Sequence, residues 1–228
     1  MVVFALRQIT WLLLLPWVYG VSKLVVELFL NASLWSPETV ALVAGAAIAV
    51  IASRLFHPFW ILYVAGHELT HALWATLFGK RVTAIRVRKS GGYVVLSGTN
   101  SLVTLAPYFF PFYGVVWLIV VTGLNLWAPL RVADWVIGFV FGGNYMLHLL
   151  MTAKVLRFRQ PDIESEGYLF SAVVVVLGNL AMGSVLCPLA LGSLRFGEMV
   201  SAVWGNSGWS IDLVAKAAGQ LIALLRAL

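Results

Sequence analysis

Residues Phe59–Phe78 read FWILYVAGHELTHALWATLF, and this apolar stretch contains the motif His67-Glu68-Leu69-Thr70-His71. A membrane-spanning helix needs about 20 mostly apolar residues, so the stretch is long enough for one. On such a helix, two histidines four residues apart project from nearly the same face, about 6 Å apart along the axis. Both imidazoles can therefore bind one Zn²⁺, with Glu68 beside them to polarise a bound water. Ionisable side chains in so apolar a helix are costly without partners, so the motif predicts a functional site.

The remainder of the chain is also strongly apolar. Of its 228 residues, 61% are hydrophobic and only 11% are charged, against about 45–50% and about 25% in soluble domains. We therefore predict an integral membrane protein without a sizeable soluble domain. Its net charge of +6 does not indicate a nucleic-acid partner, because the basic residues concentrate in two loops, Lys80–Lys89 and Lys154–Arg159. Such loops are typical of cytoplasmic connections that face anionic lipid headgroups.

Six apolar stretches are long enough to be considered as membrane spans, and the expected fold class is an all-α membrane protein with about six transmembrane helices. The stretches are Ile9–Leu30, Thr39–Ser53, Phe59–Phe78, Leu102–Trp127, Val132–Thr152 and Tyr168–Leu191. We divide the chain into N-terminal accessory membrane helices (1–56), a catalytic membrane core (57–192) and a C-terminal amphipathic tail (193–228). The end of that tail, Ile211–Leu228, is expected to lie on the membrane surface.

A short β-hairpin-like loop is predicted directly after the metal helix, at Arg81–Ser97. Polar and apolar residues roughly alternate up to Ser90, Gly91-Gly92 supplies a turn, and a β-branched run follows. A hairpin here would offer an edge strand to an unwound substrate segment. The alternative is a plain cytoplasmic turn with snorkelling basic side chains.

A catalytic zinc usually has three protein ligands, so the histidine pair requires a third. The sequence leaves two candidates. Asp162 precedes the last predicted span, on the same side of the membrane as the motif, between the chain-bending Pro161 and Gly167; its alternative role is a helix cap. His148 lies within an apolar helix. Its candidate roles are a metal ligand, a hydrogen-bond donor to a ligand, and a proton shuttle. Asn144, four residues earlier, shares its face and is a candidate for the same site.

These residues resemble the site-2 protease family of intramembrane zinc metalloproteases, and more narrowly its small bacterial members without a PDZ domain. The resemblance covers roughly Phe59–Leu180 and rests mostly on Gly66–Ala72. The segments that also look like that subgroup's pattern are Gly91-Gly92-Tyr93, Asn100 through Tyr108, and Gln160–Ile163. One departure is that the family usually has Leu-Asp-Gly in the later helix, whereas Ile163-Glu164 follows Asp162 here.

The resemblance implies a zinc metalloendopeptidase of the bacterial inner (plasma) membrane that hydrolyses peptide bonds in or near transmembrane segments. It implies His67, His71 and Asp162 as metal ligands and Glu68 as the general base. The substrate would be a membrane protein whose unwound strand is held by the hairpin or by Asn100. The alternatives are another multi-span zinc metalloprotease with a Glu as third ligand, and a non-catalytic metal-binding membrane protein. The sequence identifies neither the substrate nor the oligomeric state.

Overall fold

The computed structural model describes residues 2–31, 33–55, 59–127 and 131–192, together with positions 204, 205, 207, 208, 212 and 216. Apart from positions 212 and 216, the predicted surface helix Ile211–Leu228 lies outside the described residues. The elements in chain order are α1 (Val2–Asn31), α2 (Pro37–Leu55), α3 (Phe59–Leu77), β1 (Val82–Arg88), β2 (Gly91–Leu96), α4 (Ser101–Leu105), the 3-10 helix η1 (Ala106–Tyr108), α5 (Phe112–Trp127), α6 (Asp134–Val155), α7 (Pro161–Glu166) and α8 (Tyr168–Ala190).

Four described helices are long and apolar enough to cross a membrane, and a bent helix pair makes a possible fifth. The four lie in α1, α2, α6 and α8. The predicted fold class, a mostly helical membrane protein with a hairpin, is confirmed. The sequence predicted about six spans, whereas at most five described segments are apolar enough to be counted. The helix that is not counted is α3, whose hydropathy is reduced by His67, Glu68 and His71.

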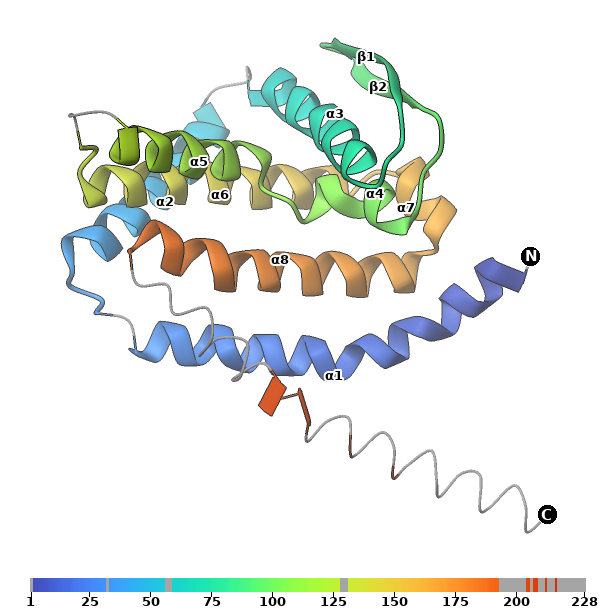
Figure 1. The fold of residues 1–228 in the computed structure, drawn as a ribbon, viewed down its shortest axis with the longest axis horizontal. Coiled ribbons are helices and arrows are strands. Elements are labelled where there is room, and N and C mark those ends of the chain that lie inside the picture. The colour runs from blue at the N-terminus through green and yellow to red at the C-terminus, as the bar shows by residue number, and fades with distance from the viewer. Residues whose placement is uncertain are drawn as a thin grey trace.

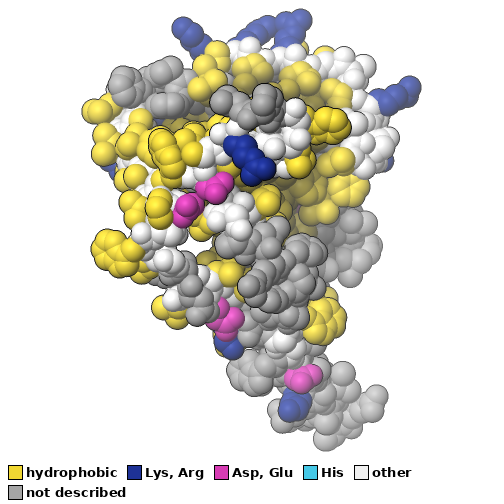
Figure 2. Space-filling model, turned by 60° about the vertical axis from the view of Figure 1, so that its left-hand side comes forward, with side chains coloured by type: hydrophobic (Ala, Val, Ile, Leu, Met, Phe, Trp, Pro, Cys, Tyr) yellow, Lys and Arg dark blue, Asp and Glu magenta, His cyan; other side chains and the backbone are white. Residues whose placement is uncertain are grey.

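Large apolar side chains cover the outer faces of these helices. Leu13 is 64% exposed, Ile51 is 58% exposed and Ile119 is 67% exposed. Figure 2 shows such side chains, in yellow, over much of one face of the molecule. Soluble monomers rarely carry apolar surface on this scale, whereas lipid tails cover it without cost. The exposed surface therefore agrees with an integral membrane protein.

The helices are arranged in layers around α8. In Figure 1, α8 lies between α1 on one side and α5 and α6 on the other, and α3 lies above α5 and α6 with the hairpin beside it. The closest helix seam is that of α2 and α6. A Cβ added at Gly45 would lie 2.0 Å from the carbonyl oxygen of Phe139, and one added at Gly142 would lie 2.1 Å from that of Leu42. Glycine at both positions thus lets the two backbones approach each other.

The stretch Leu102–Trp127, predicted as a single span, is broken in the structure. Its first part is α4 with η1, its second part is α5, and the two are bent by 83°. Asn100 begins α4 as its N-cap, while Pro107 and Pro111 lie on either side of the break. A proline has no backbone N–H and clashes with the preceding turn, so the helix does not continue through it. Tyr108, the last residue before the break, is fully buried (0% exposed).

The hairpin is confirmed, although its turn differs from the prediction. β1 and β2 pair antiparallel, and the turn is Lys89-Ser90 instead of Gly91-Gly92. The glycines open β2, where Gly91 has a φ of +132° that favours glycine. The Nε1 of Trp60 donates a hydrogen bond to the carbonyl of Lys89 at 3.1 Å, so the turn lies next to the start of α3. The hairpin therefore runs back along the helix that carries the motif.

One buried core joins the elements that surround the motif. It consists of Leu105, Ala106, Tyr108, Phe109, Val155, Ile163 and Val175, which come from α4, η1 and the residue after it, and α6, α7 and α8. Three aromatic side chains of α3, those of Trp60, Tyr63 and Trp74, pack against this core. Because the core includes Ile163, it places the short helix α7 directly beside α3.

Candidate metal centre

The structure brings together His67 and His71 of α3 and Asp162 of α7. The Nε2 of His67 lies 3.5 Å from Oδ2 of Asp162, and the Nε2 of His71 lies 3.4 Å from the same oxygen. All three ligand atoms lie within 4.8 Å of one another. They form the one group of three or more histidine, cysteine or acidic side chains that could hold a metal within the described part of the chain.

The two separations between a histidine and Asp162 fit a tetrahedral zinc site. Zinc bonds to histidine nitrogen and carboxylate oxygen are about 2.0–2.2 Å long, so two ligand atoms of one tetrahedron lie roughly 3.3–3.5 Å apart. The two nitrogen–oxygen separations, 3.5 and 3.4 Å, match that spacing. Two imidazoles with one carboxylate also form a common donor set of catalytic zinc, which keeps its fourth position open.

The two histidines are oriented by partners of their Nδ1 atoms. The Nδ1 of His71 lies 2.8 Å from the carbonyl oxygen of Val103, which accepts only an N–H. That bond fixes the tautomer and leaves Nε2 free to bind a metal. The Nδ1 of His67 lies 3.3 Å from the hydroxyl of Tyr63, one turn earlier on α3. Each histidine is thus held with Nε2 directed at Asp162.

Asp162 is held by a residue of the broken span. The hydroxyl of Tyr108 donates to Oδ2 of Asp162 at 3.0 Å, and the Nδ2 of Asn179 donates to the Tyr108 carbonyl at 2.9 Å. Burial alone would raise the pKa of the Asp162 carboxyl, but the neighbouring imidazoles of His67 and His71 outweigh it and hold the pKa well below its ordinary value. The carboxylate is therefore ionised at neutral pH, as a metal ligand must be.

Glu68 lies beside the face of α3 that carries the two histidines, on the side next to the hairpin. Its side chain is buried at 7% exposure. A Cβ added at Gly92 of β2 would lie 2.7 Å from Cγ and 2.8 Å from Oε1 of Glu68, so the glycine makes room for this carboxylate. The hairpin thus contributes the wall against which Glu68 packs.

The other predicted site residues lie outside the ligand cluster. His148 and Asn144 line a cavity on the far side of His67, and the Nδ2 of Asn144 donates to the Val140 carbonyl of its own helix at 2.8 Å. The Oδ1 of Asn100 accepts the N–H of Val103 at 2.9 Å as a helix cap. Asn100 therefore supports the residue whose carbonyl holds His71.

Sequence reasoning missed two tyrosines and one backbone carbonyl. Tyr63 had a signal, because a residue four positions before His67 faces the same way on a helix. Tyr108 and the carbonyl of Val103 had none, because their positions follow from the break in the helix.

Comparison with known proteins gives a family. A family model described as Peptidase M50B-like matches residues 39–156, which is more than half of the chain. The matched range contains the motif, the hairpin, the broken span and all of α6, and it ends before Asp162. The position of Asp162 at the metal centre therefore comes from the structure, because the family match does not include this residue. No curated protein and no solved structure gives a significant match.

Proposed function

The chain belongs to the Peptidase M50B-like family, and from this premise we propose that it is a zinc-dependent endopeptidase that cleaves peptide bonds in or near transmembrane segments. Family membership implies a metallopeptidase. The observation that carries the finer proposal is the meeting of His67, His71 and Asp162 within 4.8 Å in a membrane protein. Glu68, the residue after the first histidine, completes the set of groups that hydrolysis requires.

The proposed ligands are His67, His71 and Asp162. A zinc ion held there would supply a water of lowered pKa and a Lewis acid for the peptide carbonyl. Imidazole donors favour zinc over calcium or magnesium, which prefer oxygen ligands throughout.

Glu68 is the proposed general base and general acid. It takes a proton from the attacking water and returns it to the leaving amine as the peptide bond breaks. Metal binding alone does not need a carboxylate at this position. The intact Glu68 therefore supports catalysis over a purely metal-binding role.

The substrate we propose is a membrane protein. The backbone of a membrane helix is already hydrogen-bonded, so the segment must unwind locally before its carbonyl can be attacked. The hairpin has only two strands among the described residues, and it packs against Glu68, so an unwound segment could pair with a free strand edge there.

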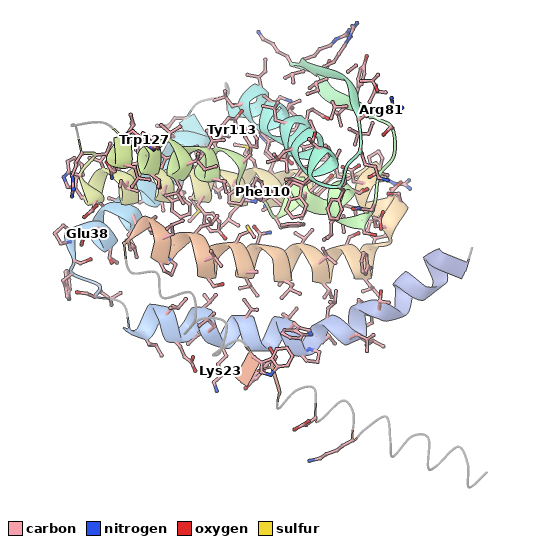
Figure 3. All side chains as sticks on the ribbon, viewed as in Figure 1. Lys23, Glu38, Arg81, Phe110, Tyr113 and Trp127 are labelled. Atoms are coloured by element: carbon pink, nitrogen blue, oxygen red, sulfur yellow. The ribbon has the colours of Figure 1, made fainter. Side chains whose placement is uncertain are left out.

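We also propose an orientation in a bacterial plasma membrane. In Figure 3, Arg81 lies toward the end of the molecule where the metal helix ends, while Glu38 and Trp127 lie at the opposite end. The second basic loop connects α6 to α7, and Figure 1 shows α7 at the same end of the molecule. Because cytoplasmic loops carry an excess of lysine and arginine, we place these basic loops in the cytoplasm.

Among the described residues, no glutamate belongs to the ligand cluster. Oε1 of Glu164 accepts hydrogen bonds from Arg159 at 2.6 Å and from Tyr168 at 2.9 Å, outside the ligand cluster. The Arg159 and Tyr168 bonds hold the pKa of Glu164 below its ordinary value. Its carboxylate is thus occupied by an arginine.

The test uses the purified full-length chain in detergent micelles with a mixture of peptides that represent unrelated transmembrane segments. Zinc content is measured by atomic absorption, and cleavage by mass spectrometry. We expect Glu68→Gln to retain zinc and to lose cleavage by about 10²-fold or more, the usual worth of general acid–base catalysis. Cleavage by Glu68→Gln at the wild-type rate would overturn the proposal.

The third ligand is tested by the same zinc measurement on two further variants. Asp162→Ala is expected to lose zinc, and His148→Ala is expected to retain it. The reverse result would show that His148 is the ligand.

A further inference from the structure

A cavity of about 290 Å³ lies beside the candidate metal centre. It is a partly open cavity lined by α3, by the bend between η1 and α5, and by α6, and His67 forms part of its wall. Figure 3 shows two of its lining residues, Phe110 and Tyr113, on the side of α3 that faces α5 and α6. An apolar cavity of about 150 Å³ is enough to bind benzene, so this space accommodates a ring-sized side chain.

The surface of the cavity is mostly apolar, although several of its lining residues are polar. The hydroxyls of Thr70 and Tyr113 donate to carbonyls of α3 at 2.6 and 2.8 Å, and the Asn144 amide donates to a carbonyl of α6 at 2.8 Å. The Nε2 of His148 has no hydrogen-bond partner among the described residues, but it is inaccessible to solvent and so presents no polar surface. The described lining includes no lysine, arginine, aspartate or glutamate.

The cavity also has a defined position relative to the proposed chemistry. An α-helix turns by roughly 100° per residue. Tyr63 and Thr70 therefore lie on one side of the face shared by His67 and His71, and Glu68 lies on the other. A peptide that crosses this face has Glu68 and the hairpin on one side and the cavity on the other. Water activated by Glu68 and a side chain entering the cavity would thus approach the peptide from opposite sides.

We propose that this cavity is the specificity pocket of the peptidase, and that it takes a large uncharged apolar side chain, such as leucine, methionine or phenylalanine, from a residue next to the scissile bond. The inference rests on the proposed function. A charged side chain would be buried there without a partner, which is costly. A small side chain would leave most of the space unfilled and forfeit its contacts.

The first experiment determines which residues flank the cuts made by the zinc-loaded wild-type protein in the mixture of transmembrane peptides. We expect large apolar residues to be enriched at one flanking position. One cut peptide is then resynthesised with alanine, leucine, phenylalanine or aspartate there. We expect kcat/KM for the leucine and phenylalanine peptides to exceed that for alanine by about tenfold or more, since one methylene in an apolar pocket discriminates about 10–200-fold.

The second experiment fills the pocket. Met151→Phe and Leu147→Phe each add a ring to its α6 wall, and we expect both to reverse the preference toward the alanine peptide. Ile119→Phe is the matched control, because it adds the same ring to a lipid-facing position of α5 that is 67% exposed. We expect its cleavage profile to equal that of the wild type.

An unchanged preference in both filled variants, or an equal loss of cleavage for all four peptides, would overturn the pocket. Failure of the proposed function would look different, because the wild type and Glu68→Gln would then be equally inactive. In that case the binding of the phenylalanine and alanine peptides to Glu68→Gln, measured by fluorescence, still tests the pocket. Adding Met151→Phe should then weaken binding of the phenylalanine peptide alone, and equal binding in its presence and absence would exclude the pocket.

Discussion

Tyr108 shows how one side chain connects parts of the site that are far apart in the sequence. Its hydroxyl donates to Asp162, its carbonyl accepts from Asn179, and its ring meets that of His67 edge-on with centroids 5.2 Å apart. Side chains that orient metal ligands from outside typically change metal affinity about 10–100-fold when they are removed. Tyr108 is therefore expected to matter to the metal without touching it.

Tyr108→Phe tests this role. The variant keeps the ring but removes the donor to Asp162, so we expect zinc affinity to fall about 10–100-fold, measured by competition with a chelator. Tyr113→Phe is the control, because its hydroxyl donates to the carbonyl of Leu62 and not to a ligand. Equal zinc affinity in the two variants would contradict the role of Tyr108.

At the residue scale, the sequence predicted the motif and left Asp162 and His148 as candidates for the third ligand, because histidines four apart on a helix and a carboxylate beside a chain-bending proline are local patterns. The family resemblance implied Asp162, and the fold brings Asp162 to the histidines. Tyr108 and the carbonyl of Val103 escaped prediction because their directions depend on a tertiary break.

At the scale of the elements, the hairpin acts as a support for the motif helix. Gly92 of β2 leaves space for the Glu68 side chain, and the backbone oxygen of Arg86 lies behind that space. A larger residue at this position meets backbone on one side and the proposed base on the other.

Gly92→Ala is therefore expected to displace Glu68. The new Cβ would lie 2.7 Å from Cγ of Glu68 and 2.8 Å from the Arg86 oxygen, so we expect cleavage to fall about tenfold or more, part of the 10²–10⁴-fold worth of a general base. Zinc content should stay at the wild-type level. Gly98→Ala is the control, since its nearest atom is 3.7 Å away; a comparable loss there would argue against a specific role for Gly92.

The cap of α4 gives a second prediction at this scale. Asn100→Ala removes the acceptor of the Val103 N–H, which we expect to cost about 0.5–2 kcal/mol of stability. Because the Val103 carbonyl holds His71, zinc affinity should fall as well. Asn100→Asp, which also caps helices, should restore both the thermal midpoint and the zinc affinity. Reduced stability with unchanged zinc affinity would separate the cap from the metal site.

Helix positions and the hairpin were predictable because hydrophobic length and alternation are properties of short segments. The break between Tyr108 and Phe112 was not recognised, although Pro107 and Pro111 were visible in the sequence, because apolar composition continues through it. The turn at Lys89-Ser90 was missed because a Gly-Gly pair is a stronger turn signal than the residues that form it.

At the scale of the whole molecule, the close contact between α2 and α6 depends on glycines, which have no side chain to keep the two backbones apart. Gly142→Ala would place a Cβ 2.1 Å from the Leu42 carbonyl, and we expect it to destabilise the protein by about 1–3 kcal/mol, as overpacking does. Gly123→Ala is the matched control, because a Cβ there meets nothing within 4 Å. Unfolding in detergent measures both, and equal stability would contradict the close seam.

The order in which the helices pack was beyond sequence reasoning. Each span is apolar around most of its circumference, so hydrophobic periodicity does not say which face meets a neighbour. The glycines of α2 and α6 do not identify the contact face from the sequence alone. Gly45 and Gly142 are needed because the backbone of the other helix lies directly opposite each of them.

The position of Asp162 gives the proposed metal a mechanical role. Asp162 and His71 stand about ninety residues apart in the chain, and an ion held by both joins α3 to α7 across that separation. A ligand that binds only the folded form stabilises it by mass action. The ion is then a staple between α3 and the connection from α6 to α8. Movement of this connection away from α3 would take Asp162 away from the ion, and the ion would then be bound more weakly. Metal binding could thus be changed without any contact with the histidines, through the position of the connection alone.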